Sequence, residues 1–248
     1  MNKRKSIRLT LIFLMIFLIF PSIIMAQGIV VASTSLAGAI AKAAGAKDIR
    51  VLTPSEIKHP PEYDLKPSDL MKFEGADIVV YGGYEKMVSK LIETSKNKNI
   101  IAIQIDTTTS PQNLVEQVRK ISKVLKTEKW VEEWEKEFSE KLKKLQNKLS
   151  PYFGKRAVVH KFAQPFARWA GLQVVHVINP GELTPKVIAD SISKQPEIVI
   201  DIAHFPIAKV ISENAGCRYI QVINFPGIGG TQSLEDIFEY NSKQLIQP

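Results

Sequence analysis

Residues 127–150 read TEKWVEEWEKEFSEKLKKLQNKLS and decide the fold of this chain. Apolar side chains recur along this stretch every three or four residues, which is the spacing of one face of an α-helix, while Glu and Lys fill most other positions. Thr127 can cap the amino end, and Pro151 follows the carboxyl end. We therefore predict one long, uninterrupted helix whose apolar face consists of Trp130, Trp134, Phe138, Leu142, Leu145 and Leu149.

Short apolar strands alternate with helices on both sides of this long helix. Before it, we predict strands at 28–33, 49–52, 77–81 and 100–105, with helices at 36–44, from Pro67, and on Met87, Leu91 and Ile92. After it, we predict strands at 157–159, 172–175, 198–202 and 219–223, with helices at 185–193 and 207–214. Such alternation is typical of parallel sheets that are covered by helices.

The long helix divides this pattern into two halves, and two interpretations are open. It is either a surface helix of a single domain or a rigid spine between two lobes. We favour the second, and we predict an α/β fold with two mostly parallel-sheet lobes joined by a long rigid spine helix. The lobes are then residues 27–125 and 152–248, and the spine helix is residues 126–151.

Residues 1–26 have the layout of a secretory signal peptide. A basic segment precedes an apolar run at 11–20, and Ala26 offers a small residue at a cleavage point. The alternative is an uncleaved anchor at 9–26, although that stretch is only marginally long enough for a membrane and contains Pro21. We therefore expect a chain that is secreted across the cytoplasmic membrane and is periplasmic or at the cell surface.

The composition narrows the function classes. The chain carries 33 Lys and Arg against 25 Asp and Glu, a net charge of +8. Because the signal segment holds four of these basic residues and no acid, the remaining 248 − 26 = 222 residues carry +8 − 4 = +4. Mixed Lys and Glu faces spread this charge, which argues against a nucleic-acid partner. Cys217 is the only cysteine, so no intrachain disulfide can form, and we interpret it as a small buried apolar side chain.

The four histidines of the chain indicate a metal site. His160, His176 and His204 come directly after, or within two or three residues of, apolar runs that we predict as strands. His59 lies in a proline-flanked loop after another predicted strand. In open α/β proteins, the loops at the carboxyl ends of the strands form the crevice in which ligands bind. Clustered imidazoles most often bind a transition metal.

Four motifs of the chain resemble those of one protein family. Residues 160–172, HKFAQPFARWAGL, are similar to a stretch of the zinc/manganese solute-binding proteins that feed ABC importers. Three further stretches resemble motifs of that family and occur in the same order: HPPEYDLKPSD at 59–69, HVINPGELTP at 176–185 and FEYN at 238–241. The likeness spans the whole chain after the signal segment.

The resemblance implies a two-lobed binding protein with the metal in the cleft between the lobes. The implied ligands are His59 from the amino-terminal lobe, His160, and His176 from the carboxyl-terminal lobe. A protein of this kind is not an enzyme: it captures a divalent metal ion and delivers it to the membrane permease of an ABC transporter. We expect it to be a monomer.

Two departures from the family pattern affect the ligand set. The interval from His59 to Pro67 is two residues longer than usual, so the loop must be reshaped to deliver His59. The fourth ligand of the family is commonly an Asp, which aligns here with Asn224, a neutral and weak donor. Our hypothesis is that His204 fills this position. The alternatives are water and Asp201, which could instead orient an imidazole N–H.

The ligand types favour zinc. Three or four imidazoles suit Zn²⁺, which accepts tetrahedral nitrogen donors, whereas Mn²⁺ prefers more oxygen than the aligned positions offer. We therefore expect Zn²⁺, with Mn²⁺ as the alternative.

Two other functions are open at this point. A secreted zinc-dependent hydrolase would use three histidines and an activated water, with Glu62 or Asp201 as its general base. The hydrolase signature His-Glu-x-x-His does not occur in the chain, however. A binding protein for a chelated metal ligand would need an aromatic-lined cleft, for which the chain offers Phe162, Phe166, Trp169 and Phe205, although their spacing favours the core.

Overall fold

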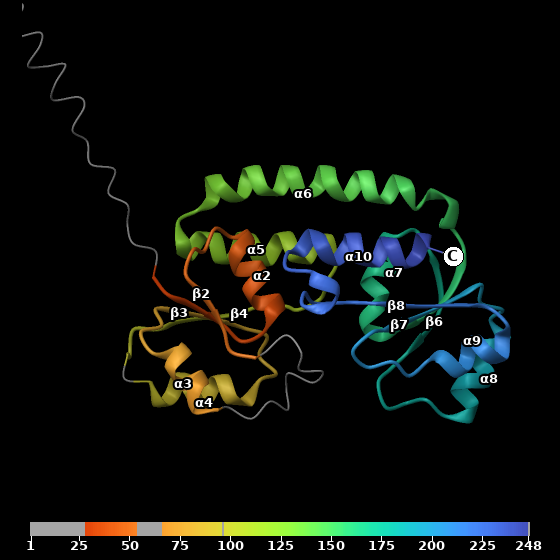
Figure 1. Cartoon of the computed structure of the whole chain (residues 1–248), viewed down its shortest axis with the longest axis horizontal. Coiled ribbons are helices and arrows are strands. Elements are labelled where there is room, and N and C mark those ends of the chain that lie inside the picture. The colour runs from red at the N-terminus through yellow and green to blue at the C-terminus, as the bar shows by residue number, and fades with distance from the viewer. Residues whose placement is uncertain (1–27, 54–65, 96, 248) are drawn as a thin grey trace, which may run out of the picture.

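Two four-stranded sheets form the framework of the protein (Figure 1). The computed structural model describes residues 28–53, 66–95 and 97–247. The first sheet has the order β2-β1-β3-β4, with β1 Val30–Ala32, β2 Ile49–Val51, β3 Ile78–Tyr81 and β4 Ile101–Gln104. The second has the order β6-β5-β7-β8, with β5 Arg156–His160, β6 Gln173–Ile178, β7 Ile198–Ile202 and β8 Arg218–Val222. Neighbouring strands are parallel in both sheets, which confirms the predicted fold class.

Helices cover both faces of the sheets (Figure 1). On one side, α3 Pro67–Phe73 and α4 Lys86–Thr94 lie against the first sheet, and α8 Pro185–Ser193 and α9 Lys209–Ala215 lie against the second. The other side carries α2 Ser35–Ala43, α5 Pro111–Leu125, α6 Glu128–Lys148, α7 Gln164–Trp169 and α10 Leu234–Ile246. Both α5 and α7 lie outside the predicted elements, although Ser110 and Pro111 give α5 an ordinary start signal.

The predicted long helix is α6, which runs along both halves of the molecule (Figure 1). Thr127 is its amino-terminal cap residue, but the Thr127 hydroxyl donates to the Ala44 carbonyl at 2.6 Å instead of capping the helix. The predicted apolar face is wrong at one position, because Trp130 is 57 % exposed and Val131 is buried in its place. The indole N–H of Trp130 donates to the Ala43 carbonyl at 3.2 Å, so the ring lies along the end of α2.

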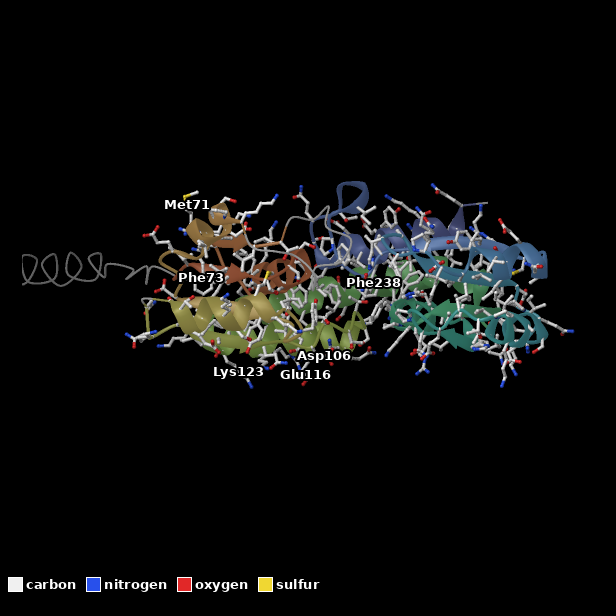
Figure 2. All side chains as sticks on the ribbon, turned by 90° about the horizontal axis from the view of Figure 1, so that it is seen from below. Met71, Phe73, Asp106, Glu116, Lys123 and Phe238 are labelled. Atoms are coloured by element: carbon white, nitrogen blue, oxygen red, sulfur yellow. The ribbon has the colours of Figure 1, made fainter. Side chains whose placement is uncertain are left out.

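One apolar cluster continues through both halves of the molecule. It joins Ile40 of α2 and Ile200 of β7 through Phe138 of α6. The Phe138 ring stacks on Trp134, with centroids 4.9 Å apart, and meets the edge of Phe238 at 5.9 Å. Figure 2 shows Phe238 near the middle of the molecule. The two sheets therefore share a core and are not joined by the spine helix alone.

Replacing Phe138 by alanine is expected to lower the free energy of unfolding by about 3–5 kcal/mol, because it leaves a cavity in this shared core. Trp130→Ala is the matched control, since it also removes an aromatic ring from α6 but at an exposed position, and it should cost about 1 kcal/mol. Urea unfolding followed by circular dichroism measures both values. Equal losses for the two variants would contradict the shared core.

The proposed boundaries at 27–125, 126–151 and 152–248 stay a prediction. Helix α10 belongs to the last of these segments, yet it packs against α2 and α6 as well as against β8. The predicted signal segment and His59 lie outside the described residues. Among the helices of the described ranges, none is long and apolar enough to cross a membrane.

Candidate metal centre

His160 is the last residue of β5, at the carboxyl edge of the second sheet, and it is fully buried. Its Nδ1 accepts the Phe162 N–H at 3.2 Å, at the start of a short 3₁₀ turn, Lys161–Ala163. Its Nε2 is buried and has no hydrogen-bond partner among the described residues. A metal on Nε2 needs the tautomer with the proton on Nδ1, so binding there would displace the Phe162 N–H. Burial lowers the pKa of His160, and the negative charge of Asp201 opposes that shift in part.

Asp201 lies on β7, the strand next to β5, and its carboxylate accepts four hydrogen bonds. Its Oδ1 accepts the Ile202 N–H at 2.9 Å. Its Oδ2 accepts the backbone N–H groups of Ile207 and Ala208, at 2.7 and 2.6 Å, and the Tyr219 hydroxyl at 3.1 Å. Burial raises the pKa of Tyr219 to about 12, and the Asp201 charge adds to that shift. Three donors saturate Oδ2, which makes that oxygen a poor metal ligand or general base, whereas Oδ1 accepts one hydrogen bond.

His204 lies two residues beyond the end of β7 and packs against the loop that follows β8. Its ring centroid is 4.7 Å from that of Phe225. The neighbouring Asn224 has a buried Oδ1 with no hydrogen-bond partner among the described residues. This loop also contacts the other half of the molecule, because the Ser35 hydroxyl at the start of α2 donates to the Pro226 carbonyl at 2.7 Å. His204 and Asn224 therefore lie close to the boundary between the two halves.

His176 lies within β6, whereas the sequence predicts that it follows a strand ending at 175. The pairing of β5 with β6 shifts after Ala157 and places His176 opposite Val158, two residue pairs before the strand ends. Since side chains alternate along a strand, His176 and His160 lie on the same face of the sheet. The His176 Nδ1 is 3.4 Å from the Ser191 hydroxyl of α8, which leaves Nε2 as the nitrogen available to a ligand.

The first sheet ends in a second group of polar side chains. The Ser33 hydroxyl and the Gly82 N–H donate to the Oε1 of Glu85, at 2.6 and 3.2 Å. Glu85 is 2 % exposed, and its Oε2 has no hydrogen-bond partner among the described residues. Burial raises the pKa of the nearby Tyr84 to about 12, with the Glu85 charge adding to the shift. Sequence reasoning missed Glu85, whose only signal was its place before the predicted helix on Met87.

A shallow polar depression of about 470 Å³ lies at the carboxyl end of β4. It is lined by Gly82, Gln104, Ile105, Asp106, Thr107 and Lys120. The Lys120 ammonium donates to the Gln104 carbonyl at 2.6 Å, so this charge is already paired with backbone. Figure 2 shows Asp106 at the edge of the molecule. The depression contains no histidine and is separate from the predicted ligands.

The structure places His160 and His176 on one face of the second sheet, but the described residues do not assemble a complete site. Within residues 28–53, 66–95 and 97–247, no three His, Cys, Asp or Glu side chains form a group that could hold a metal ion. His160 and Asp201 are neighbours on adjacent strands, and His204 packs against Phe225, the residue after Asn224. A metal site built on these histidines therefore needs a donor from beyond the described residues, of which His59 is the predicted one.

Solved structures share this fold. The periplasmic metal binding protein from candidatus liberibacter asiaticus is 16% identical, with a TM-score of 0.72 over 88% of this chain and 98% of that chain. Its Cd-bound form gives a TM-score of 0.71 at 16% identity and the same coverage. A mutant of the laminin-binding adhesin Lmb from Streptococcus agalactiae gives 0.69 at 16% identity, over 88% and 99%. At these identities the likeness concerns the fold alone.

Sequence comparison identifies the family. No curated protein sequence matches the chain. The profile of the ZnuA family, described as zinc-uptake complex component A, periplasmic, matches residues 30–198, which is more than half of the chain. This match includes three of the four motifs, at 59–69, 160–172 and 176–185, and confirms the family resemblance: the chain belongs to the ZnuA family.

Proposed function

We propose that this protein captures a divalent transition metal, zinc foremost, outside the cytoplasmic membrane and delivers it to the membrane permease of an ABC transporter. The observation that carries the proposal is His160, a fully buried imidazole at the carboxyl edge of the second sheet whose Nε2 has no hydrogen-bond partner among the described residues. A buried polar nitrogen without a partner costs free energy unless a ligand engages it. Membership of the ZnuA family supports a metal ion as that ligand.

The proposed ligands are His59, His160, His176 and His204. His160 and His176 share a face of the second sheet, and His204 follows the adjacent strand, which supports the grouping of all three on one side of the proposed site. His59 would come from the first half of the chain, as the resemblance implies. With ligands from both halves, metal binding would depend on the relative position of the two sheets. The shared core fixes that position.

Zinc is the preferred ion, and manganese is the alternative. Imidazole nitrogens suit Zn²⁺, and Asn224 supplies only a neutral oxygen where the family commonly has a carboxylate. Solved structures of the protein from candidatus liberibacter asiaticus are described as Mn-bound and Cd-bound. We therefore propose that the site accepts several divalent ions and binds zinc most tightly.

The proposed mechanism is capture without chemical conversion of a substrate. Imidazoles replace the waters of the ion in a partly closed site, and the loaded protein then docks on the permease. Three donors saturate the Oδ2 of Asp201, which argues against the role of general base that a hydrolase would need. We accordingly propose a binding protein that acts as a monomer.

Metal affinity is expected to fall at least about tenfold between about pH 7.5 and about pH 5, because an imidazole must be neutral to bind a metal. An ordinary histidine is half protonated at about pH 6.5. Burial lowers the pKa of His160, so this imidazole stays neutral to a lower pH than an ordinary histidine. The same shift makes the contribution of His160 to the stability of the metal-free fold present above about pH 6.5 and lost as the pH falls through its folded-state pKa. Competition with a chromophoric chelator at both values measures the affinity, and equal affinities would contradict imidazole ligands.

Elemental analysis of the protein purified from its native compartment tests the proposed function. We expect about one zinc ion per chain, and dialysis against a chelator followed by titration should restore that ratio. Protein that contains no metal and takes up neither zinc nor manganese would refute the proposal.

A further inference from the structure

A buried carboxylate lies beside His160, one of the proposed ligands of the second half. Asp201 is fully buried on β7. Because Val159 of β5 pairs with Ile200 of β7, the next residues along these parallel strands, His160 and Asp201, lie side by side. The negative charge of Asp201 acts on the His160 imidazole, which agrees with that placement.

The four donors to Asp201 come from three parts of the fold. Ile202 is on the same strand, Tyr219 is on the neighbouring strand β8, and Ile207 and Ala208 lie at the start of α9. An ionised carboxylate has about four positions for donors, two on each oxygen. Three donors saturate Oδ2, and Oδ1 accepts one, so most of the acceptor capacity of Asp201 is used within the fold.

These bonds close residues 203–206 into a short loop between β7 and α9. One end of the loop is held at Ile202, and the other end is held at Ile207 and Ala208 by the same carboxylate. His204 lies within this loop and packs on Phe225. The position of His204 relative to His160 is therefore set through Asp201.

The charge of Asp201 matters because Asn224 is neutral. A buried negative charge near a cation stabilises it more strongly than the same charge in water, since the surrounding dielectric constant is lower. Asp201 and His160 are neighbours, so a cation on His160 would lie within range of this charge.

We propose that Asp201 is the positioning residue of the metal site: it fixes the loop that carries His204, and from its place beside His160 it supplies the negative charge that Asn224 does not. This inference depends on the proposed metal-binding function. It assigns to Asp201 a role that differs from direct ligation and from ordinary loop stabilisation.

The test compares Asp201→Asn with Asp236→Asn, a matched control. Asp236 also accepts two backbone N–H groups, from Gln232 and Ser233 at 2.8 and 2.9 Å, but it caps α10. In Asp201→Asn we expect zinc affinity to fall at least about tenfold, while the absorption spectrum of the Co²⁺-loaded protein keeps its shape because the ligands are unchanged. In Asp236→Asn we expect a lower Tm with zinc affinity within about twofold of wild type.

Two results would overturn the inference. A cobalt spectrum that shows a lost oxygen ligand in Asp201→Asn would make Asp201 a ligand. If Asp201→Asn and Asp236→Asn lose the same zinc affinity and the same Tm, the role of Asp201 is merely structural.

Tyr219→Phe serves as a second variant if Asp201→Asn does not fold, because it removes one donor and keeps the carboxylate. We expect about threefold weaker zinc binding, and unchanged binding would overturn the inference. Wild-type protein that binds neither Zn²⁺ nor Co²⁺ would instead refute the proposed function itself, and this inference with it.

Discussion

Replacement of His160 by asparagine is expected to weaken zinc binding by about 100-fold and to leave the fold intact. Zinc sites in small proteins are worth about 10–16 kcal/mol, so one ligand of four contributes about 3 kcal/mol, and each 1.4 kcal/mol is about tenfold in affinity. Asparagine removes the imidazole Nε2 that lacks a hydrogen-bond partner among the described residues. Its side-chain oxygen can still accept the Phe162 N–H, as His160 Nδ1 does, because asparagine is well suited to the start of a helical turn.

The comparison with alanine and with His176 sharpens this experiment. His160→Ala removes both the ligand and the acceptor for Phe162, so it should lose the same affinity and also some stability. His176→Asn removes the other imidazole from the same face of the sheet. If all four histidines are ligands, His176→Asn should weaken binding as strongly as His160→Asn. Chelator competition measures affinity, and thermal unfolding without metal measures stability. Wild-type affinity in His160→Asn would refute the proposed site.

The parts of the fold that follow from local sequence could be predicted closely. Helix α8 has the predicted bounds, because Pro185 presets its first turn and the Thr184 hydroxyl accepts the Val187 N–H at 3.3 Å. The strands of both sheets are short apolar runs and lie within a few residues of their predicted positions. Signals of this kind act over a few residues, so the sequence carries them directly.

The parts that depend on distant partners were predicted less well. The buried face of α6 includes Val131 and not Trp130, because the end of α2 covers one side of that turn and supplies the carbonyl for the Trp130 indole. His176 lies inside β6 because the strand continues to Ile178 in its pairing with β5. Neither outcome is visible in the spacing of residues along the chain, since both depend on which elements pack together.

In the candidate site, too, local features could be predicted from the sequence, whereas contacts between distant residues could not. The sequence placed His160 at a strand end and Asn224 where the family commonly has a carboxylate, and the structure finds both with buried atoms that lack a partner among the described residues. The sequence left open whether Asp201 is a ligand. Its four hydrogen-bond donors come from residues up to eighteen positions away, so only the fold could show that three of them saturate Oδ2.

Asn224→Asp is expected to tighten zinc binding by about tenfold, because it puts a carboxylate at the position where the family commonly has one. A carboxylate is a charged and stronger donor than the neutral amide, and about 1.4 kcal/mol of added attraction corresponds to tenfold. Mn²⁺ should gain more than Zn²⁺, since it prefers oxygen ligands. Without metal, the new charge lies in the same half of the molecule as buried Asp201, and we expect a lower Tm that added metal more than restores.

Asn214→Asp is the charge-matched control for this gain. Asn214 is exposed on α9, where its side-chain amide donates to the Val210 carbonyl at 2.7 Å, so an added charge there is screened by solvent. Zinc affinity in this variant should stay within about twofold of wild type. Titration of both variants with Zn²⁺ and Mn²⁺ separates a local ligand effect from a change in net charge. Because Asn224 lies beside Phe225, whose ring packs on His204, a gain confined to Asn224→Asp would place the bound ion at this loop. Unchanged or weaker binding in Asn224→Asp would instead move the site away from the loop and leave His204 without a role as a ligand.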